Sequence, residues 1–117
     1  MLPSRLPRPI RLSLFALAVA ILFLLCVLPS DTLPDPGTGD RFEHSAAWFV
    51  LTATGYLLAP RRVLAIPAFA LAYGVFIEVV QGFVGRDNDL RDVAADAVGV
   101  ALAVGLFLAA RRWRAAR

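Results

Sequence analysis

The stretch YGVFIEVVQGFVGRDNDLRDVAADAVG, from Tyr73 to Gly99, decides the fold because it places polar side chains inside two apolar runs. Its first half is typical of an apolar helix, yet it carries Glu78 and Gln81. A short polar segment, GRDNDLRD, follows, and the second apolar run carries Asp96. Carboxylates are costly in apolar surroundings unless they are paired and hydrogen-bonded. The pattern therefore predicts two helices that turn these side chains toward each other.

The composition indicates an integral membrane protein. Of the 117 residues, 59% are hydrophobic, and the mean hydropathy is +0.69, whereas a soluble domain is about 45–50% apolar. The formal charge of +3 does not indicate a nucleic-acid-binding protein, because the arginines sit at the ends of apolar runs and form no basic stripe. The single cysteine, Cys26, excludes a disulfide within one chain.

Four runs reach or approach the about 20 apolar residues that a membrane span needs. They cover residues 12–28, 42–58, 63–83 and 93–110, and the second run is the weakest. We therefore expect an all-α bundle of four transmembrane helices that forms a single domain over residues 1–117. No A-x-A-like cleavage site follows the first run, so we expect it to act as an uncleaved signal anchor.

The distribution of charge predicts the orientation of these spans. Arginines without acidic neighbours occupy the N-terminus, residues 61–62 and the C-terminus. All nine acidic residues fall in or beside the segments 29–41 and 84–92. The positive-inside rule then places both termini in the cytoplasm and these two segments on the outer side.

Helical spacing places the polar residues of the third and fourth runs on stripes of small residues. Residues three or four apart share a helix face, and small residues at this spacing let membrane helices approach closely. We therefore predict that Gly74 and Gly99 are packing positions. The two stripes are Ala70, Gly74, Glu78 and Gln81 in the third run, and Asp92, Asp96, Gly99 and Ala103 in the fourth.

The outer end of such a bundle is expected to hold a polar cluster, because the second run also carries a histidine one turn into the membrane. Ionisable groups within a membrane are functional-site candidates by default. Either His44 or Arg86 would neutralise a carboxylate, or one carboxyl would keep its proton. The candidate cluster comprises His44, Glu78, Gln81, Arg86, Asp92 and Asp96.

The same residues have structural interpretations that stay open. Asp40 and Asp89 each precede a run and are followed three residues later by an acidic residue, as in helix caps. Inert polar packing is an alternative for the carboxylates and Gln81, and an interfacial hydrogen bond is an alternative for His44. No metal site or cofactor is predicted, because DNDLRD lacks the glycine and final glutamate of a calcium loop.

Two motifs together resemble the VanZ-like family of bacterial membrane proteins. DRFEH, from Asp40 to His44, is similar to that family's D-K-x-x-H, with Arg41 in place of lysine. The stretch quoted first is similar to its E-x-x-Q, R, D-x-x-x-N-x-x-G block. The matching positions are Glu78, Gln81, Arg86, Asp92 and Gly99, and Asp96 stands where the family usually has asparagine.

This resemblance, which covers about residues 40–105, implies a multi-pass protein of the bacterial cytoplasmic membrane that belongs to the cell envelope. It also implies a contribution to resistance against teicoplanin-type glycopeptides through an outward-facing polar pocket. The partners would be membrane lipid and either a lipid-linked cell-wall precursor or a lipophilic glycopeptide. The ligand and the oligomeric state stay open.

Two further functions stay open. In a membrane-embedded enzyme, Glu78 or Asp96 would be the general base, His44 a proton shuttle and Arg86 an electrophilic stabiliser. The sequence favours this enzyme less, since it shows no nucleophile motif and no metal-ligand set. In a structural or accessory subunit, the cluster would only fix how the helices pack.

Overall fold

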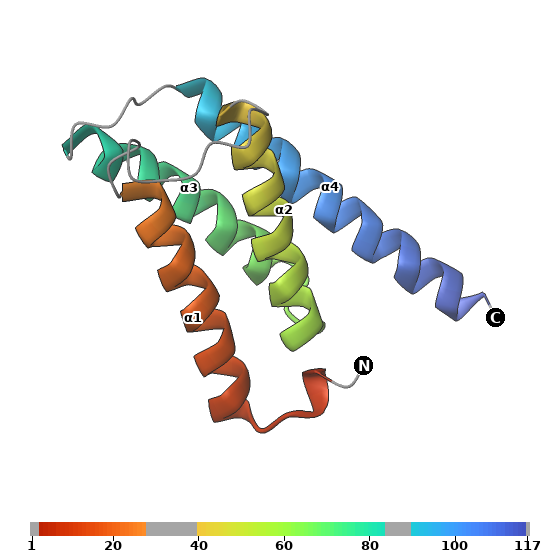
Figure 1. Cartoon of the computed structure of the whole chain (residues 1–117). Coiled ribbons are helices and arrows are strands. Elements are labelled where there is room, and N and C mark those ends of the chain that lie inside the picture. The colour runs from red at the N-terminus through yellow and green to blue at the C-terminus, as the bar shows by residue number, and fades with distance from the viewer. Residues whose placement is uncertain (1–2, 28–39, 84–89, 117) are drawn as a thin grey trace.

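The computed structural model describes residues 3–27, 40–83 and 90–116, with the side chains of residues 40 and 41 excepted. These residues are helical apart from short connections, which confirms the prediction of an all-α fold for the described part of the chain. Figure 1 shows the arrangement of the helices. In chain order they are the short η1 (Pro3–Arg5), α1 (Arg8–Val27), α2 (Asp40–Leu58), α3 (Ala65–Phe83) and α4 (Leu90–Ala115).

Prolines fix where several helices begin and end. Pro9 and Pro67 lie in the first turns of α1 and α3, where a missing backbone N–H costs nothing. After α2, the amide of Ala59 still donates to Gly55 O at 2.8 Å, but Pro60 cannot extend this pattern. The short turn before α3 therefore follows directly from the sequence.

Three of the four long helices, α1, α3 and α4, are long and apolar enough to cross a membrane. The remaining helix, α2, does not meet this condition, although the sequence predicts a span over 42–58. Its mean hydropathy is lowered by polar side chains, among them His44, Ser45 and Thr52. Nevertheless α2 lies at the centre of the bundle, where it contacts α1, α3 and α4.

The outward face of α2 is apolar. The exposed residues of this helix are Phe42, Ala46, Val50 and Leu57, and their spacing places them along one side. Thr52 and Trp48, by contrast, are fully buried. Part of the low hydropathy of α2, that of Thr52 and Trp48, therefore comes from the side that faces the other helices.

The closest helix pair is α2 with α4, and Gly99 makes this closeness possible. A Cβ atom at Gly99 would overlap the carbonyl oxygen of Ser45 and lie 3.0 Å from the backbone nitrogen of Phe49. Ser45 Oγ also donates to Ala95 O at 2.7 Å. Nearer the other end of the pair, the rings of Tyr56 and Phe107 stack with their centroids 3.9 Å apart.

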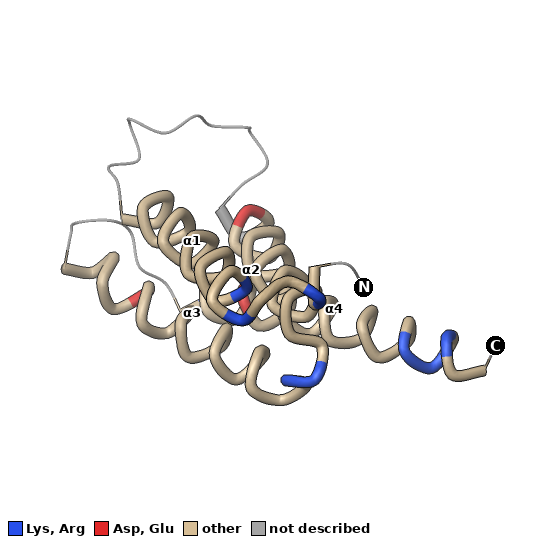
Figure 2. The backbone as a smooth tube through the Cα atoms, turned by 90° about the horizontal axis from the view of Figure 1, so that it is seen from below, with Lys and Arg blue, Asp and Glu red and all other residues tan. Residues whose placement is uncertain are grey.

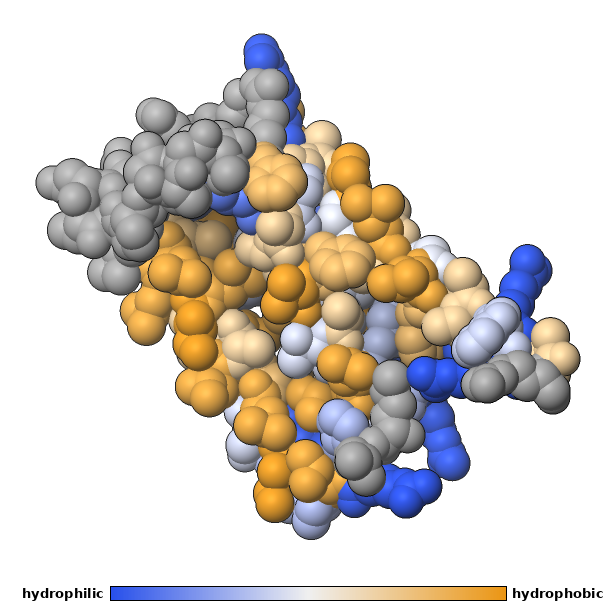
Figure 3. All heavy atoms as spheres, turned by 45° about the vertical axis from the view of Figure 1, so that its right-hand side comes forward, coloured by the Kyte–Doolittle hydropathy of each residue, from blue (hydrophilic) through white to orange (hydrophobic). Residues whose placement is uncertain are grey.

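Except for Arg91 in the first turn of α4, the described arginine side chains lie away from the acidic residues along the bundle. Figure 2 shows basic residues near both chain ends and at the turn after α2. The described acidic side chains, those of Glu43, Glu78, Asp92 and Asp96, belong to the first turns of α2 and α4 and the last turns of α3. Between the two ends, the face in Figure 3 is covered largely by apolar side chains.

Candidate functional site

His44 of α2 lies between two carboxylates of α4. Its Nδ1 is 2.8 Å from Asp96 Oδ1, and its Nε2 is 4.0 Å from Asp92 Oδ2. Asp92 and Asp96 are four residues apart and so occupy the same face of α4. A charged imidazole in this position would offset part of the negative charge that these carboxylates bring into the bundle.

The third helix adds Glu78 and Gln81 to this group. Only 7% of Glu78 and 2% of Gln81 are exposed, and Asp96 is 1% exposed. The charge of Glu78 acts on His44 together with those of Asp96 and Asp92. Glu78 thus adds a third carboxyl group that acts on the imidazole, and we call these five residues, His44, Glu78, Gln81, Asp92 and Asp96, the acidic cluster.

Gly74 of α3 leaves the space that the carboxylate of Asp96 occupies. A Cβ atom at Gly74 would lie only 2.8 Å from Asp96 Oδ2 and 3.3 Å from Trp48 Nε1. Any larger residue in this position of α3 would push against Asp96 and Trp48. Gly74 thus allows α3 to pack closely against α4, as Gly99 allows α4 to pack closely against α2.

Two buried acceptors of the acidic cluster lack a donor among the described residues. They are Asp96 Oδ2 and Gln81 Oε1. The other polar atom of Gln81, Nε2, donates to Cys26 O of α1 at 3.0 Å. A buried acceptor without a donor costs about 1–3 kcal/mol, so the cluster has capacity to accept hydrogen bonds from a molecule that enters it.

A chain of aromatic residues connects the acidic cluster to the rest of the bundle. The imidazole of His44 stacks on Trp48 with centroids 5.7 Å apart, and Trp48 Nε1 donates to Ala70 O of α3 at 2.8 Å. Trp48 in turn stacks on Tyr73, whose hydroxyl donates to Val19 O of α1 at 2.8 Å. The resulting path from Asp96 to Val19 crosses all four long helices.

Of the predicted site residues, the structure brings His44, Asp92 and Asp96 together and places Glu78 and Gln81 on the buried face of α3. Arg86 and Asp89 lie outside the described residues. Asp40 is the first residue of α2, and its side chain is likewise not described. Trp48 and Tyr73 are not among the residues that the sequence predicted for the site. The signal that links Trp48 to the site is its position four residues after His44, on the same helix face.

Two hydroxyl groups on α2 already donate to backbone carbonyl groups. Ser45 Oγ donates to Ala95 O, and Thr52 Oγ1 donates to Trp48 O within its own helix at 2.8 Å. Among the described residues, no three His, Cys, Asp or Glu side chains are placed to hold a metal ion. The contacts that these polar residues make are therefore hydrogen bonds and charge pairs.

Replacing Trp48 by phenylalanine tests the connection between α2 and α3. The ring is kept, but the bond from Nε1 to Ala70 O is lost, so we expect the free energy of unfolding to fall by about 0.6–2 kcal/mol. Thr52→Val is the control, because its hydroxyl bonds only within α2. Thermal unfolding in detergent measures both variants, and equal stability of Trp48→Phe and the unmodified chain would contradict the expectation.

The fold and the buried acidic cluster together describe a helical membrane protein. The comparison with known proteins agrees: the chain is 41% identical over 92 residues to a Bacillus subtilis (strain 168) protein named "Uncharacterized membrane protein YwnJ". The aligned region is 77% of this chain and 63% of the relative, so the chain spans less than two thirds of the relative's length. No model of a known protein family matches the chain. No solved structure matches it either.

Proposed function

We propose that the chain is a VanZ-like integral membrane protein of the bacterial cell envelope whose acidic cluster binds a hydrogen-bond-donating group of an envelope ligand. The observation that carries this proposal is that two acceptors of the acidic cluster, Asp96 Oδ2 and Gln81 Oε1, are buried without a donor among the described residues. An amine or hydroxyl group of a ligand would supply the missing donors. A cationic amine would in addition be attracted by the excess of carboxyl groups over imidazole.

The proposal includes four membrane spans with both termini in the cytoplasm. Support for α2 as a span comes from its apolar exposed face and its central place. With 19 residues it is about 28 Å long at 1.5 Å per residue, close to the about 30 Å of a bilayer core. The arginines at the opposite end from the acidic cluster support this orientation by the positive-inside rule.

The ligand class that fits best is an amphiphile with a polar, amine-bearing or hydroxyl-bearing group. A lipid headgroup, a lipid-linked cell-wall precursor and a lipophilic glycopeptide all meet this description. The VanZ-like resemblance favours the last of these, and so a contribution to teicoplanin-type resistance. The ligand group would reach the acidic cluster from the outer side, where α2 and α4 begin.

Susceptibility to teicoplanin tests the proposal in a sensitive host that expresses the chain. Glu78→Gln removes one charge and keeps the size of the side chain, so we expect protection to fall to the level of cells without the protein. Glu43→Gln is the matched control, because it makes the same change near the start of α2 but outside the acidic cluster. Thermal stability in detergent is measured for each purified variant. A host that the unmodified chain leaves fully sensitive would overturn the glycopeptide role.

A second candidate function, a structural clasp, is favoured by the bonds that join all four helices through Trp48 and Tyr73. In that case the acidic cluster would fix helix packing in a membrane subunit and bind nothing. Its signature differs from that of the first proposal. Glu78→Gln would then lower thermal stability and protection together, whereas a binding site predicts lost protection with unchanged stability.

A further inference from the structure

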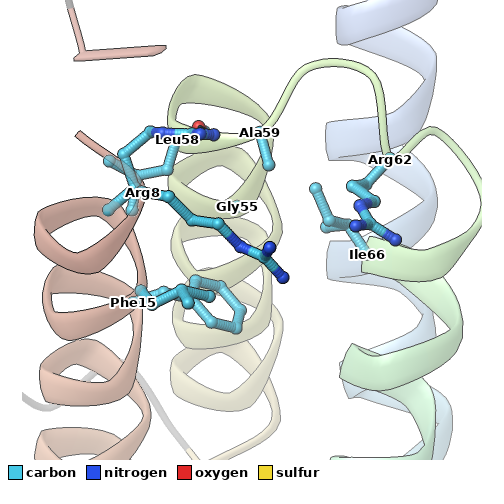
Figure 4. A pocket seen from close by; sticks show the side chains of 9 residues that line it. Arg8, Phe15, Gly55, Leu58, Ala59, Arg62 and Ile66 are labelled. Carbon is cyan, nitrogen blue, oxygen red and sulfur yellow. Dashed lines mark hydrogen bonds between the residues drawn. The ribbon is translucent and has the colours of Figure 1, made fainter. Parts of the chain in front are cut away.

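A cavity of about 360 Å³ lies at the basic end of the bundle, opposite the acidic cluster. Figure 4 shows that α1, the C-terminal part of α2 and the turn before α3 surround it. The side chain of Arg8 extends past Phe15 into this space, and Arg62 lies across from it on the turn (Figure 4). The lining consists of Arg8, Arg11, Leu12, Phe15, Gly55, Leu58, Ala59, Arg62 and Ile66.

The three arginines of this cavity differ in the hydrogen bonds that their side chains make. The guanidinium of Arg11 donates through Nε to Leu6 O at 3.0 Å and through Nη1 to Leu58 O at 3.1 Å. Arg11 therefore joins α1 to the end of α2. Arg8 and Arg62 make no ion pair with the described residues, whose acidic side chains belong to the other ends of the helices. The cavity thus concentrates positive charge, and its described lining includes no acidic side chain.

An apolar groove continues from this cavity along α1 and α3. Leu12 and Phe15 line both spaces, and the groove, with a volume of about 830 Å³, extends along α1 as far as Leu24. Its other walls include Phe69 and Phe76 of α3. From Leu12 to Leu24 the helix rises about 18 Å, slightly more than the about 15 Å that half of the hydrocarbon core of a bilayer spans.

We propose that the cavity and the groove together bind one anionic phospholipid. Arg8 and Arg62 hold the phosphodiester of the headgroup, since guanidinium groups match phosphate oxygens in charge and geometry. An acyl chain lies in the groove between α1 and α3. Basic pockets between membrane helices are known to bind anionic headgroups. Here the arginines lie at one end for the headgroup, and the apolar groove continues from them for the acyl chain.

Binding of phosphatidylglycerol to the purified full chain in neutral detergent tests the proposal. We expect Arg8→Ala/Arg62→Ala to weaken binding at least about tenfold, which is about 1.4 kcal/mol. Arg61→Ala is the matched control, because Arg61 is the exposed neighbour of Arg62 and does not line the cavity. Equal losses in the control and the double variant would overturn the proposal, since they would show attraction to surface charge alone.

The same cavity chemistry would suit a free phosphate ion, and two further measurements distinguish that source from a lipid. Inorganic phosphate and phosphatidylcholine are titrated alone, and we expect neither to bind as tightly as phosphatidylglycerol. Ala20→Trp fills the groove at an exposed position of α1 and leaves the arginines intact. We expect it to weaken lipid binding. Unchanged lipid binding in Ala20→Trp, or equally tight binding of inorganic phosphate, would overturn the lipid assignment.

Discussion

Leucine in place of Gly99 is expected to separate α2 from α4 and to lower the free energy of unfolding by more than about 3 kcal/mol, the upper end for ordinary overpacking. The obstacle is backbone: a Cβ atom at this position already overlaps Ser45 O and lies 3.0 Å from Phe49 N. A side chain can rotate away from an added group, whereas a helix backbone has to move as a unit. The bond from Ser45 Oγ to Ala95 O would be lost in the same movement.

The chain offers a matched control for this change in its own fourth helix. Gly105 lies six residues further along α4, and a Cβ atom there would meet nothing within 4 Å. Leucine at Gly105 should therefore leave stability unchanged or raise it, because glycine within a helix is less favourable by about 1 kcal/mol. Thermal unfolding in detergent measures both variants. A Gly99→Leu protein as stable as Gly105→Leu would contradict the close contact of α2 and α4.

Much of the close contact between α2 and α4 could be predicted from the spacing of Asp92, Asp96, Gly99 and Ala103. Their spacing of three or four residues defines one helix face, and the structure buries Asp96, Gly99 and Ala103. The corresponding stripe of α3 is buried over Ala70, Gly74, Glu78 and Gln81. In both helices a face of small and polar residues packs against another helix. The packing face can therefore be recognised from the local sequence.

The central position of α2 could not be predicted in the same way. Its polar residues make it the weakest span by hydropathy, yet this is what suits it to the interior, where Ser45 and Trp48 find backbone partners on α4 and α3. Those partners are carbonyl groups of residues 50 and 22 positions away in the chain. No local pattern identifies which carbonyl a side chain will reach, so the path from His44 through Tyr73 to α1 appears only in three dimensions.

The pairing of His44 with Asp96 is expected to produce the second large effect. His44→Leu removes the partner at 2.8 Å from Asp96 Oδ1 and leaves a carboxyl group that is 1% exposed with neither oxygen hydrogen-bonded among the described residues. Breaking a buried pair from one side costs about 3–5 kcal/mol. We therefore expect the thermal unfolding temperature of His44→Leu to fall well below that of the unmodified chain in the same detergent.

Two variants of Asp96 show whether the loss arises from the pair itself. Asp96→Asn keeps an acceptor for His44 Nδ1–H and removes the charge, so its stability should remain within about 1 kcal/mol of the unmodified chain, the usual net value of one hydrogen bond. In the double variant His44→Leu/Asp96→Leu no carboxyl group is left without a partner. Its loss should be smaller than the sum of the losses of His44→Leu and Asp96→Leu, each measured as a single variant, by about 0.5–3 kcal/mol. Additive losses would mean that the two side chains stabilise the bundle independently. They would contradict a stabilising contact between His44 and Asp96 in the acidic cluster.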